Sequence, residues 1–151
     1  MLRFLKKKKI LNIIPINKFQ MLKLEDFPFQ HNIETRFRDL DAFNHVNNAV
    51  FLTYFEDARR CFFEKWNINL QERSLIVASI KIDYLNQLKH PASLIIGQKI
   101  ARLGSKSFDI FSILFHENNH ICTATTTIVC YNFLIKKTIP LFEEIKKDFN
   151  I

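Results

Sequence analysis

A short polar segment, residues 39–48, contains the side chains of this sequence best suited to chemistry. It holds two carboxylates, one histidine and three asparagines. A carboxylate can attack a carbonyl carbon or take a proton from water, and nearby donors can bind the negative charge that develops. The same residue types are also favoured in turns, where they bond to neighbouring backbone groups. By residue type alone, the segment is either a catalytic loop or a structural turn.

The polar segment lies between a predicted strand and a predicted long helix. Before it, Ile33, Thr35 and Phe37 alternate with charged residues, as in a strand with one buried face. After it, residues 49–66 place apolar side chains at helical spacing, and Asn47 or Asn48 can cap the first N–H groups. The apolar face of this helix consists of Val50, Phe51, Tyr54, Phe55, Ala58, Phe62 and Trp66.

The rest of the chain has the pattern of an antiparallel sheet. Alternating or β-branched runs predict strands over residues 74–84, 94–103, 107–116 and 121–131, and Pro140 precedes a possible short helix. Turn-like residues separate the later strands, so these strands are expected to be antiparallel. The sequence therefore predicts an α+β fold, with one long central helix wrapped by a five-stranded antiparallel sheet.

The excess positive charge is confined to one end of the chain. Residues 1–24 carry seven basic and no acidic residues, which leaves 15 bases against 15 acids in residues 25–151. We therefore expect a basic, disordered extension over residues 1–24, one domain over residues 25–151 and no nucleic-acid partner. No run is long enough to cross a membrane, and the three cysteines lack the spacing of a zinc site. These features favour a cytoplasmic protein with reduced thiols, and residues 1–20 match an organellar targeting segment poorly.

Residues 38–51, read as Arg-Asp-Leu-Asp-Ala-Phe-Asn-His-Val-Asn-Asn-Ala-Val-Phe, and residues 55–59, read as Phe-Glu-Asp-Ala-Arg, carry a family resemblance. They resemble the hotdog-fold acyl-CoA thioesterases of the 4-hydroxybenzoyl-CoA thioesterase type, and the order of elements agrees over about residues 29–131. The resemblance implies a hotdog fold, hydrolysis of an acyl-CoA thioester without a cofactor, and a homodimer or homotetramer with active sites between subunits.

The same resemblance implies roles for individual residues. Asp41 holds the place of the catalytic carboxylate, as nucleophile or as general base, and Asn48 that of a residue that polarises the carbonyl or orients water. Asn44 stands where the family has glycine, and asparagine tolerates the left-handed backbone that such a turn needs. Phe51 replaces a common tyrosine, and Phe51 and Tyr54 would line the acyl tunnel on the aromatic face of the helix.

Further polar residues have both a functional and a structural interpretation. Lys106 and Ser107, in a predicted hairpin, resemble the family's binding site for the nucleotide end of coenzyme A, although a lysine at a turn is commonly only solvated. His45 is expected mainly to fix the turn, and Glu56, a second choice of base, can pair with neighbouring arginines on the helix. His116 and His120 lack a third ligand, so we expect no metal.

Two alternatives to an acyl-CoA thioesterase remain at this point. An acyl-carrier-protein thioesterase would use the same chemistry with a protein partner. A non-catalytic hotdog module would bind acyl groups without releasing a thiol.

Overall fold

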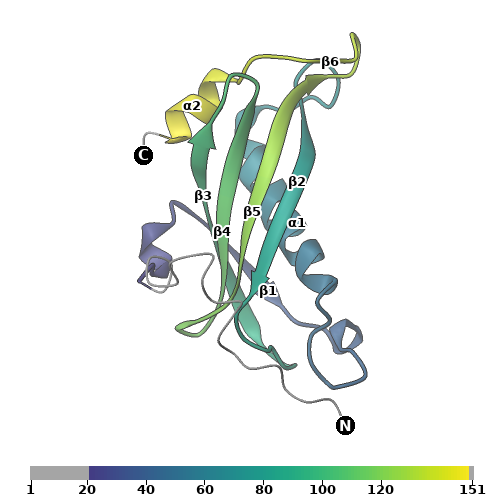
Figure 1. Ribbon diagram of the computed structural model, residues 1–151, viewed down its shortest axis with the longest axis vertical. Helices are drawn as coiled ribbons and strands as arrows, with labels where there is room; N and C mark the ends of the chain where they lie inside the picture. Colours follow the sequence, from purple (N-terminus) through teal and green to yellow (C-terminus); the bar gives the residue numbers. More distant parts are fainter. Residues whose placement is uncertain (1–20, 150–151) are drawn as a thin grey trace, which may run out of the picture.

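The protein forms a curved antiparallel sheet with one long helix lying along one face (Figure 1). The computed structural model describes residues 21–149. The strands are β1 (Phe29–Glu34), β2 (Ser74–Tyr84), β3 (Ser93–Leu103), β4 (Ser107–His116), β5 (Asn119–Asn132) and the short β6 (Lys137–Thr138). The helices are α1 (Val50–Phe63), extended by a 3₁₀ turn over Glu64–Trp66, and α2 (Glu143–Phe149).

The sheet follows the order β1-β3-β4-β5-β2, and β6 pairs with the end of β5. Neighbouring strands are antiparallel throughout this path. The predicted α+β class, the four strands after the helix and the hotdog arrangement are therefore confirmed. β2 forms one edge of the sheet and β1 the other, so α1 is followed by a strand that pairs with the last long strand rather than with β3.

The first strand begins and ends earlier than predicted. β1 covers Phe29–Glu34, whereas Phe37 lies in a 3₁₀ turn and its side chain is 80% exposed. The cause is Asp39, whose carboxylate accepts the backbone N–H of Arg36 at 2.8 Å while its own N–H donates to the Arg36 carbonyl at 2.9 Å. These local bonds compete with strand pairing and turn the chain before it reaches Phe37.

The apolar face predicted for α1 is confirmed. The side chains of Phe51, Tyr54, Phe55, Ala58 and Phe62 are buried against the sheet, and Trp66 is buried in the following turn. They pack on inward-facing residues of the central strands, including Ile96, Ile110, Leu114 and Ile128. Burial of these bulky groups fixes α1 on the sheet. It thereby also fixes the N-terminal end of the helix, which directly follows the polar segment.

The opposite face of the sheet is partly covered by the segment that precedes β1. Phe27 packs on Phe111 and Phe115, and Leu22 and Leu24 lie against the same cluster. A Cβ at Gly97 would lie 2.6 Å from the Phe27 ring, so β3 needs glycine at the point where this ring approaches. Residues 1–20 of the predicted basic extension lie outside the described residues. Within residues 21–149, no helix is long and apolar enough to span a membrane, and the cytoplasmic location stays a prediction.

Candidate active site

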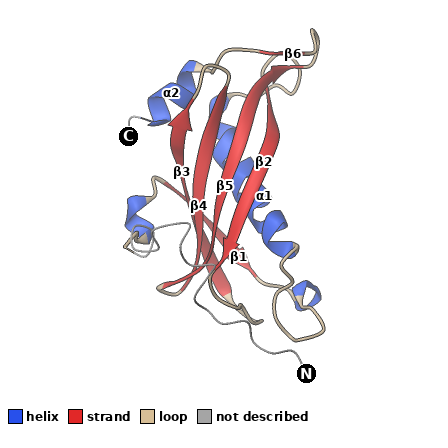
Figure 2. Ribbon diagram, viewed as in Figure 1, coloured by secondary structure: helices blue, strands red, loops and turns tan. Residues whose placement is uncertain are grey.

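The polar segment forms a tight loop between the 3₁₀ turn Phe37–Asp39 and α1, at the lower right of Figure 2. An isolated bridge joins Leu40 to Val46. The Asp41 N–H donates to the His45 carbonyl at 2.8 Å, and the Asn44 N–H donates to the Asp41 carbonyl at 3.1 Å. Asn44 has a φ of 59°, which is the left-handed conformation expected for a residue in the place of glycine. The loop is thus closed by its own backbone.

One oxygen of the Asp41 carboxylate holds this loop in shape. Oδ1 accepts the backbone N–H of Phe43 at 2.8 Å and that of His45 at 3.2 Å. Within residues 21–149, Oδ2 has no hydrogen-bond partner. The half-buried side chain of Asp41 is therefore fixed through one oxygen while the other is available to react.

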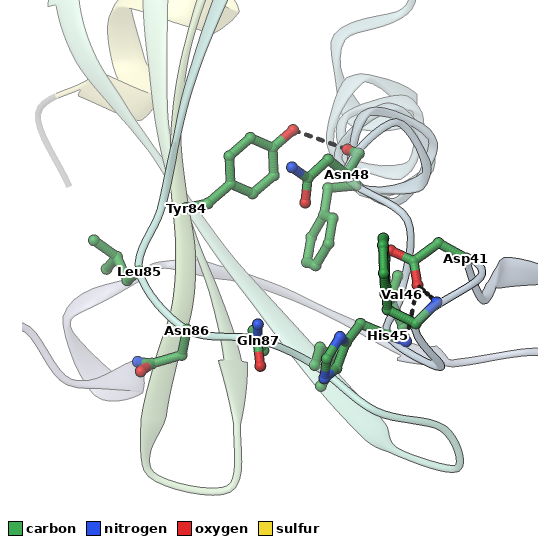
Figure 3. Close-up of a pocket in the computed structure, with 11 residues that line it drawn as sticks. Asp41, His45, Val46, Asn48, Tyr84, Leu85, Asn86 and Gln87 are labelled. Carbon is green, nitrogen blue, oxygen red and sulfur yellow. Dashed lines mark hydrogen bonds between the residues drawn. The ribbon is translucent and has the colours of Figure 1, made fainter. Parts of the chain in front are cut away.

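A cavity of about 530 Å³ lies beside Asp41 (Figure 3). In the figure, Asp41 lies on one side of it and the segment from Tyr84 to Gln87, which follows β2, on the other. Polar and apolar groups both reach the wall, so it can accept a polar reacting group and an acyl chain together. The lining residues are Asp41, Phe43, His45, Val46, Asn48, Phe51, Tyr84, Leu85, Asn86, Gln87 and Leu88.

The two asparagines before α1 have different environments. The Asn47 side chain accepts the N–H of Ala49 at 2.9 Å, and its carbonyl accepts the N–H of Val50 at the same distance. Ala49 is at the N-cap of α1, which has no side-chain cap, so Asn47 closes the turn that precedes the helix. The Asn48 carbonyl accepts the Tyr84 hydroxyl at 2.8 Å, and its side-chain amide, which lines the cavity, has no partner among the described residues.

Asp39, two residues before Asp41, has a structural environment. It is buried, and its Oδ2 accepts the Tyr54 hydroxyl at 2.6 Å and the Arg36 N–H at 2.8 Å. Burial alone would raise the pKa of Asp39, but the hydrogen bonds from Tyr54 and Arg36 outweigh it and hold the pKa below its ordinary value. Burial and this carboxylate raise the pKa of the Tyr54 hydroxyl, which therefore stays protonated as the donor.

Several predicted site residues lie away from this cavity within one chain. Tyr54 borders a second cavity, of about 370 Å³, between β1 and α1, and Glu56 is exposed on the helix. Lys106, whose Nζ lies 3.4 Å from Thr138 Oγ1, and Ser107 are in the β3–β4 hairpin at the opposite end of the sheet (Figure 1). Their predicted contacts with substrate stay predictions.

Sequence reasoning did bring Asp41, His45, Asn48 and Phe51 together, and all four line the cavity. It missed the wall formed by Tyr84, Leu85, Asn86 and Gln87. The sequence signal for that wall is weak, since it consists only of the polar residues Asn86 and Gln87 after the point where the strand pattern of β2 stops. Their place opposite Asp41 depends on long-range pairing: Tyr84 lies against Cys122, and the N–H groups of Leu85 and Asn86 donate to the Ile121 carbonyl.

Comparison with known proteins decides the family. A family model described as the thioesterase-like superfamily matches residues 35–149. The chain belongs to this superfamily. The predicted relationship to hotdog-fold thioesterases, and with it the assignment as a thioester hydrolase, is thereby confirmed.

Individual relatives agree with this family. Long-chain acyl-CoA thioesterase FadM of Escherichia coli is 27% identical over 125 residues, which are 78% of this chain and 94% of FadM. Uncharacterized protein YsmA of Bacillus subtilis is 34% identical over 86 residues, 56% of this chain, and the match spans 58% of YsmA. A thioesterase from Thermus thermophilus, solved with coenzyme A and Zn, superposes with a TM-score of 0.75 at 29% identity, covering 83% of this chain and 99% of that protein.

Proposed function

We propose that this chain is an acyl-CoA thioesterase whose active carboxylate is Asp41. The observation that carries the proposal is that the two oxygens of this carboxylate differ: Oδ1 accepts two backbone N–H groups, whereas Oδ2, at the wall of the cavity, has no partner among residues 21–149. The similarity to FadM, named a long-chain acyl-CoA thioesterase, and to a thioesterase that binds coenzyme A supports this choice of substrate class.

Hydrolysis follows from this geometry with water and side chains alone. Oδ2 of Asp41 either attacks the thioester carbonyl carbon or takes a proton from the water that attacks it. In the first route the C–S bond breaks as a mixed anhydride forms on Asp41, and water then cleaves this anhydride to the acid and supplies the proton of the coenzyme A thiol. In the second route the C–S bond breaks after water has added to the carbonyl, and the proton taken by Asp41 passes to the leaving thiolate. The apolar part of the wall, which includes Val46, Phe51 and Leu88, receives the acyl chain.

The oxyanion that forms on the carbonyl is assigned to the Asn48 amide. The N–H groups of Ala49 and Val50 already donate to Asn47, so the start of α1 does not offer these two donors to a substrate. A fixed donor of this kind contributes roughly 3–4 kcal/mol to transition-state stabilisation in acyl-transfer enzymes. Asn48 is held at the cavity by the bond between its carbonyl and Tyr84.

The active unit proposed here is a homodimer formed along β2. Within the described part of the chain, β2 pairs with β5 alone, which leaves an 11-residue strand with one free edge. Val77, Tyr84 and Leu85, on or just after this strand, are between 40% and 49% exposed. Long uncovered edges are sites of strand pairing between chains. Tyr84 and Leu85 also line the cavity, so a partner on this edge would lie beside the active site.

The direct test is the release of coenzyme A by the full chain and by its Asp41→Asn variant, over a panel of aliphatic and aromatic acyl-CoAs. Asparagine keeps an oxygen for the Phe43 and His45 N–H groups, so we expect a folded protein whose kcat is lower by about 10³-fold. Glu56→Gln serves as the matched control, because it removes the other candidate base at an exposed position. Full activity of Asp41→Asn, or a comparable loss in Glu56→Gln, would overturn the assignment.

A further inference from the structure

A group of metal-binding side chains that the proposed reaction does not use lies between β1 and α1. His31 Nε2, a carboxylate oxygen of Asp57 and Cys61 Sγ all lie within 4.8 Å of one another. His31 comes from the middle of β1, and the other two lie one turn apart on α1. None of the three lines the cavity beside Asp41. The group is therefore separate from the active site.

We propose that His31, Asp57 and Cys61 form a Zn²⁺ site that joins β1 to α1. One nitrogen, one oxygen and one sulfur ligand form a set that zinc accepts, and three protein ligands with a water molecule complete a tetrahedron. Ligands one helical turn apart, as in Asp57 and Cys61, share one face of the helix and can reach one ion.

The three ligand atoms lie within 4.8 Å of one another, so an ion requires any pair that is this far apart to close by roughly 1 Å. Bonds of 2.0–2.3 Å in a tetrahedron put neighbouring ligand atoms about 3.3–3.8 Å apart. His31 Nε2 and Asp57 Oδ2 are 2.8 Å apart, so an ion requires this pair to open by roughly 0.5 Å. The side chains of His31 and Asp57 are 21% and 48% exposed, and Asp57 borders the second cavity, so the ion has an entry path and room for water.

The charges around the group permit a divalent cation. Asp57 brings a carboxylate to the group, and it contacts His31 at 2.8 Å and Arg60 at 3.4 Å. Arg60 lies 3.4 Å from both Asp57 Oδ1 and Cys61 Sγ, and this cation has to move aside. Its other nitrogen already bonds to Glu64 at 2.9 Å and the side chain is 64% exposed, so Arg60 can stay paired with Glu64 when the metal binds.

The test is titration of the untagged full chain, freed of metal with a chelator, with Co²⁺ and then with Zn²⁺. A tetrahedral Co²⁺ site with a thiolate gives intense visible d–d bands and a sulfur-to-metal charge-transfer band, and Zn²⁺ should remove both by displacement. Zn²⁺ should also raise the Tm of the wild type, because it binds the folded state. Neither readout depends on thioester hydrolysis.

Variants decide whether these three residues are the ligands. Cys61→Ser should lose the charge-transfer band, and His31→Gln should bind Zn²⁺ at least about tenfold more weakly. His116→Gln, at a half-buried histidine outside the group, is the matched control and should bind as the wild type does. A wild type that shows no Co²⁺ bands and no rise in Tm with Zn²⁺, or a band that persists in Cys61→Ser, would overturn the site and leave His31 and Asp57 as a hydrogen-bonded pair.

Discussion

Asp39→Asn is expected to lower stability and leave the chemistry largely intact, the reverse of Asp41→Asn. The Asp39 carboxylate receives two charge-assisted hydrogen bonds, from Tyr54 and from the Arg36 N–H, and pairs with the Arg36 guanidinium at 3.3 Å. A neutral amide weakens each bond by about 1 kcal/mol, and the ion pair adds less than about 1 kcal/mol because Arg36 is 49% exposed. The sum is roughly 2–3 kcal/mol, or a Tm lower by roughly 5–10 °C.

The measurements are thermal unfolding and acyl-CoA turnover per folded molecule. Asp39→Asn should keep kcat within about threefold of the wild type at a temperature where it is fully folded, because Asp39 lies behind the loop and does not line the cavity. Tyr54→Phe is a milder companion, since it removes one of the same two bonds and should lower the Tm by about half as much. An unchanged Tm in Asp39→Asn, or a 100-fold loss of kcat in folded protein, would refute the division between the two aspartates.

Two other predictions concern the same loop. Asn48→Ala should lower kcat about 100- to 1,000-fold with little change in Tm. Asn47→Ala should keep kcat and cost about 1 kcal/mol of stability, because it removes the side-chain bond that closes the turn before α1. Equal effects on kcat would contradict the roles given to the two residues. The folded-state pKa of Asp39 is lowered, so its contribution to stability is complete above the unfolded pKa of about 4 and is lost as the pH falls below it. Urea unfolding between pH 3 and 7 should show that the free energy of unfolding falls at acid pH in the wild type and falls less in Asp39→Asn.

The fold could be predicted because its local patterns agree with its tertiary structure. The apolar stripe of α1 and the strands after it are visible in the sequence and are confirmed. The error at Phe37 has a definite cause: alternation continued past Glu34, but the Asp39 side chain turned the backbone first. In the turns between the later strands, Glu117 has a positive φ of 55°, although glycine accepts this conformation more readily and Gly104 does not adopt it. Tertiary pairing of the flanking strands decides these turns.

Only one side of the candidate site could be predicted from the sequence. Asp41, Asn48 and Phe51 are close in the chain and were found together, whereas Tyr84 reaches them through the pairing of β2 with β5, which no local pattern reveals. The same limit applies to His31, Asp57 and Cys61. No metal was expected from the sequence because the cysteines lack the spacing of a zinc site and His116 and His120 lack a third ligand, while these ligands come from two elements joined only by packing.

The predicted role of Lys106 depends on the proposed dimer. Strand register places Ser107 roughly 24 Å along β4 from Leu114, which shares its level in the sheet with Tyr84, so Lys106 is far from the cavity of its own chain. A twofold axis beside β2 runs the two β2 strands antiparallel and brings the Lys106 end of one sheet to the Tyr84 end of the other. Lys106 of the partner subunit could then bind a phosphate of coenzyme A.

Mixing of inactive subunits tests this arrangement. Lys106→Ala is expected to keep about a tenth of the wild-type kcat/KM. When equal amounts of Lys106→Ala and Asp41→Asn chains are refolded together, about half of the dimers contain one chain of each kind. Each mixed dimer then has one intact site if the two residues act across the interface, and about a quarter of the wild-type kcat/KM returns. If both residues act within one chain, no site is restored and only about a twentieth remains. The lower value would show that Lys106 acts within its own chain, whereas an unchanged kcat/KM in Lys106→Ala would assign it to a solvated turn. A monomer by light scattering would remove the dimer itself.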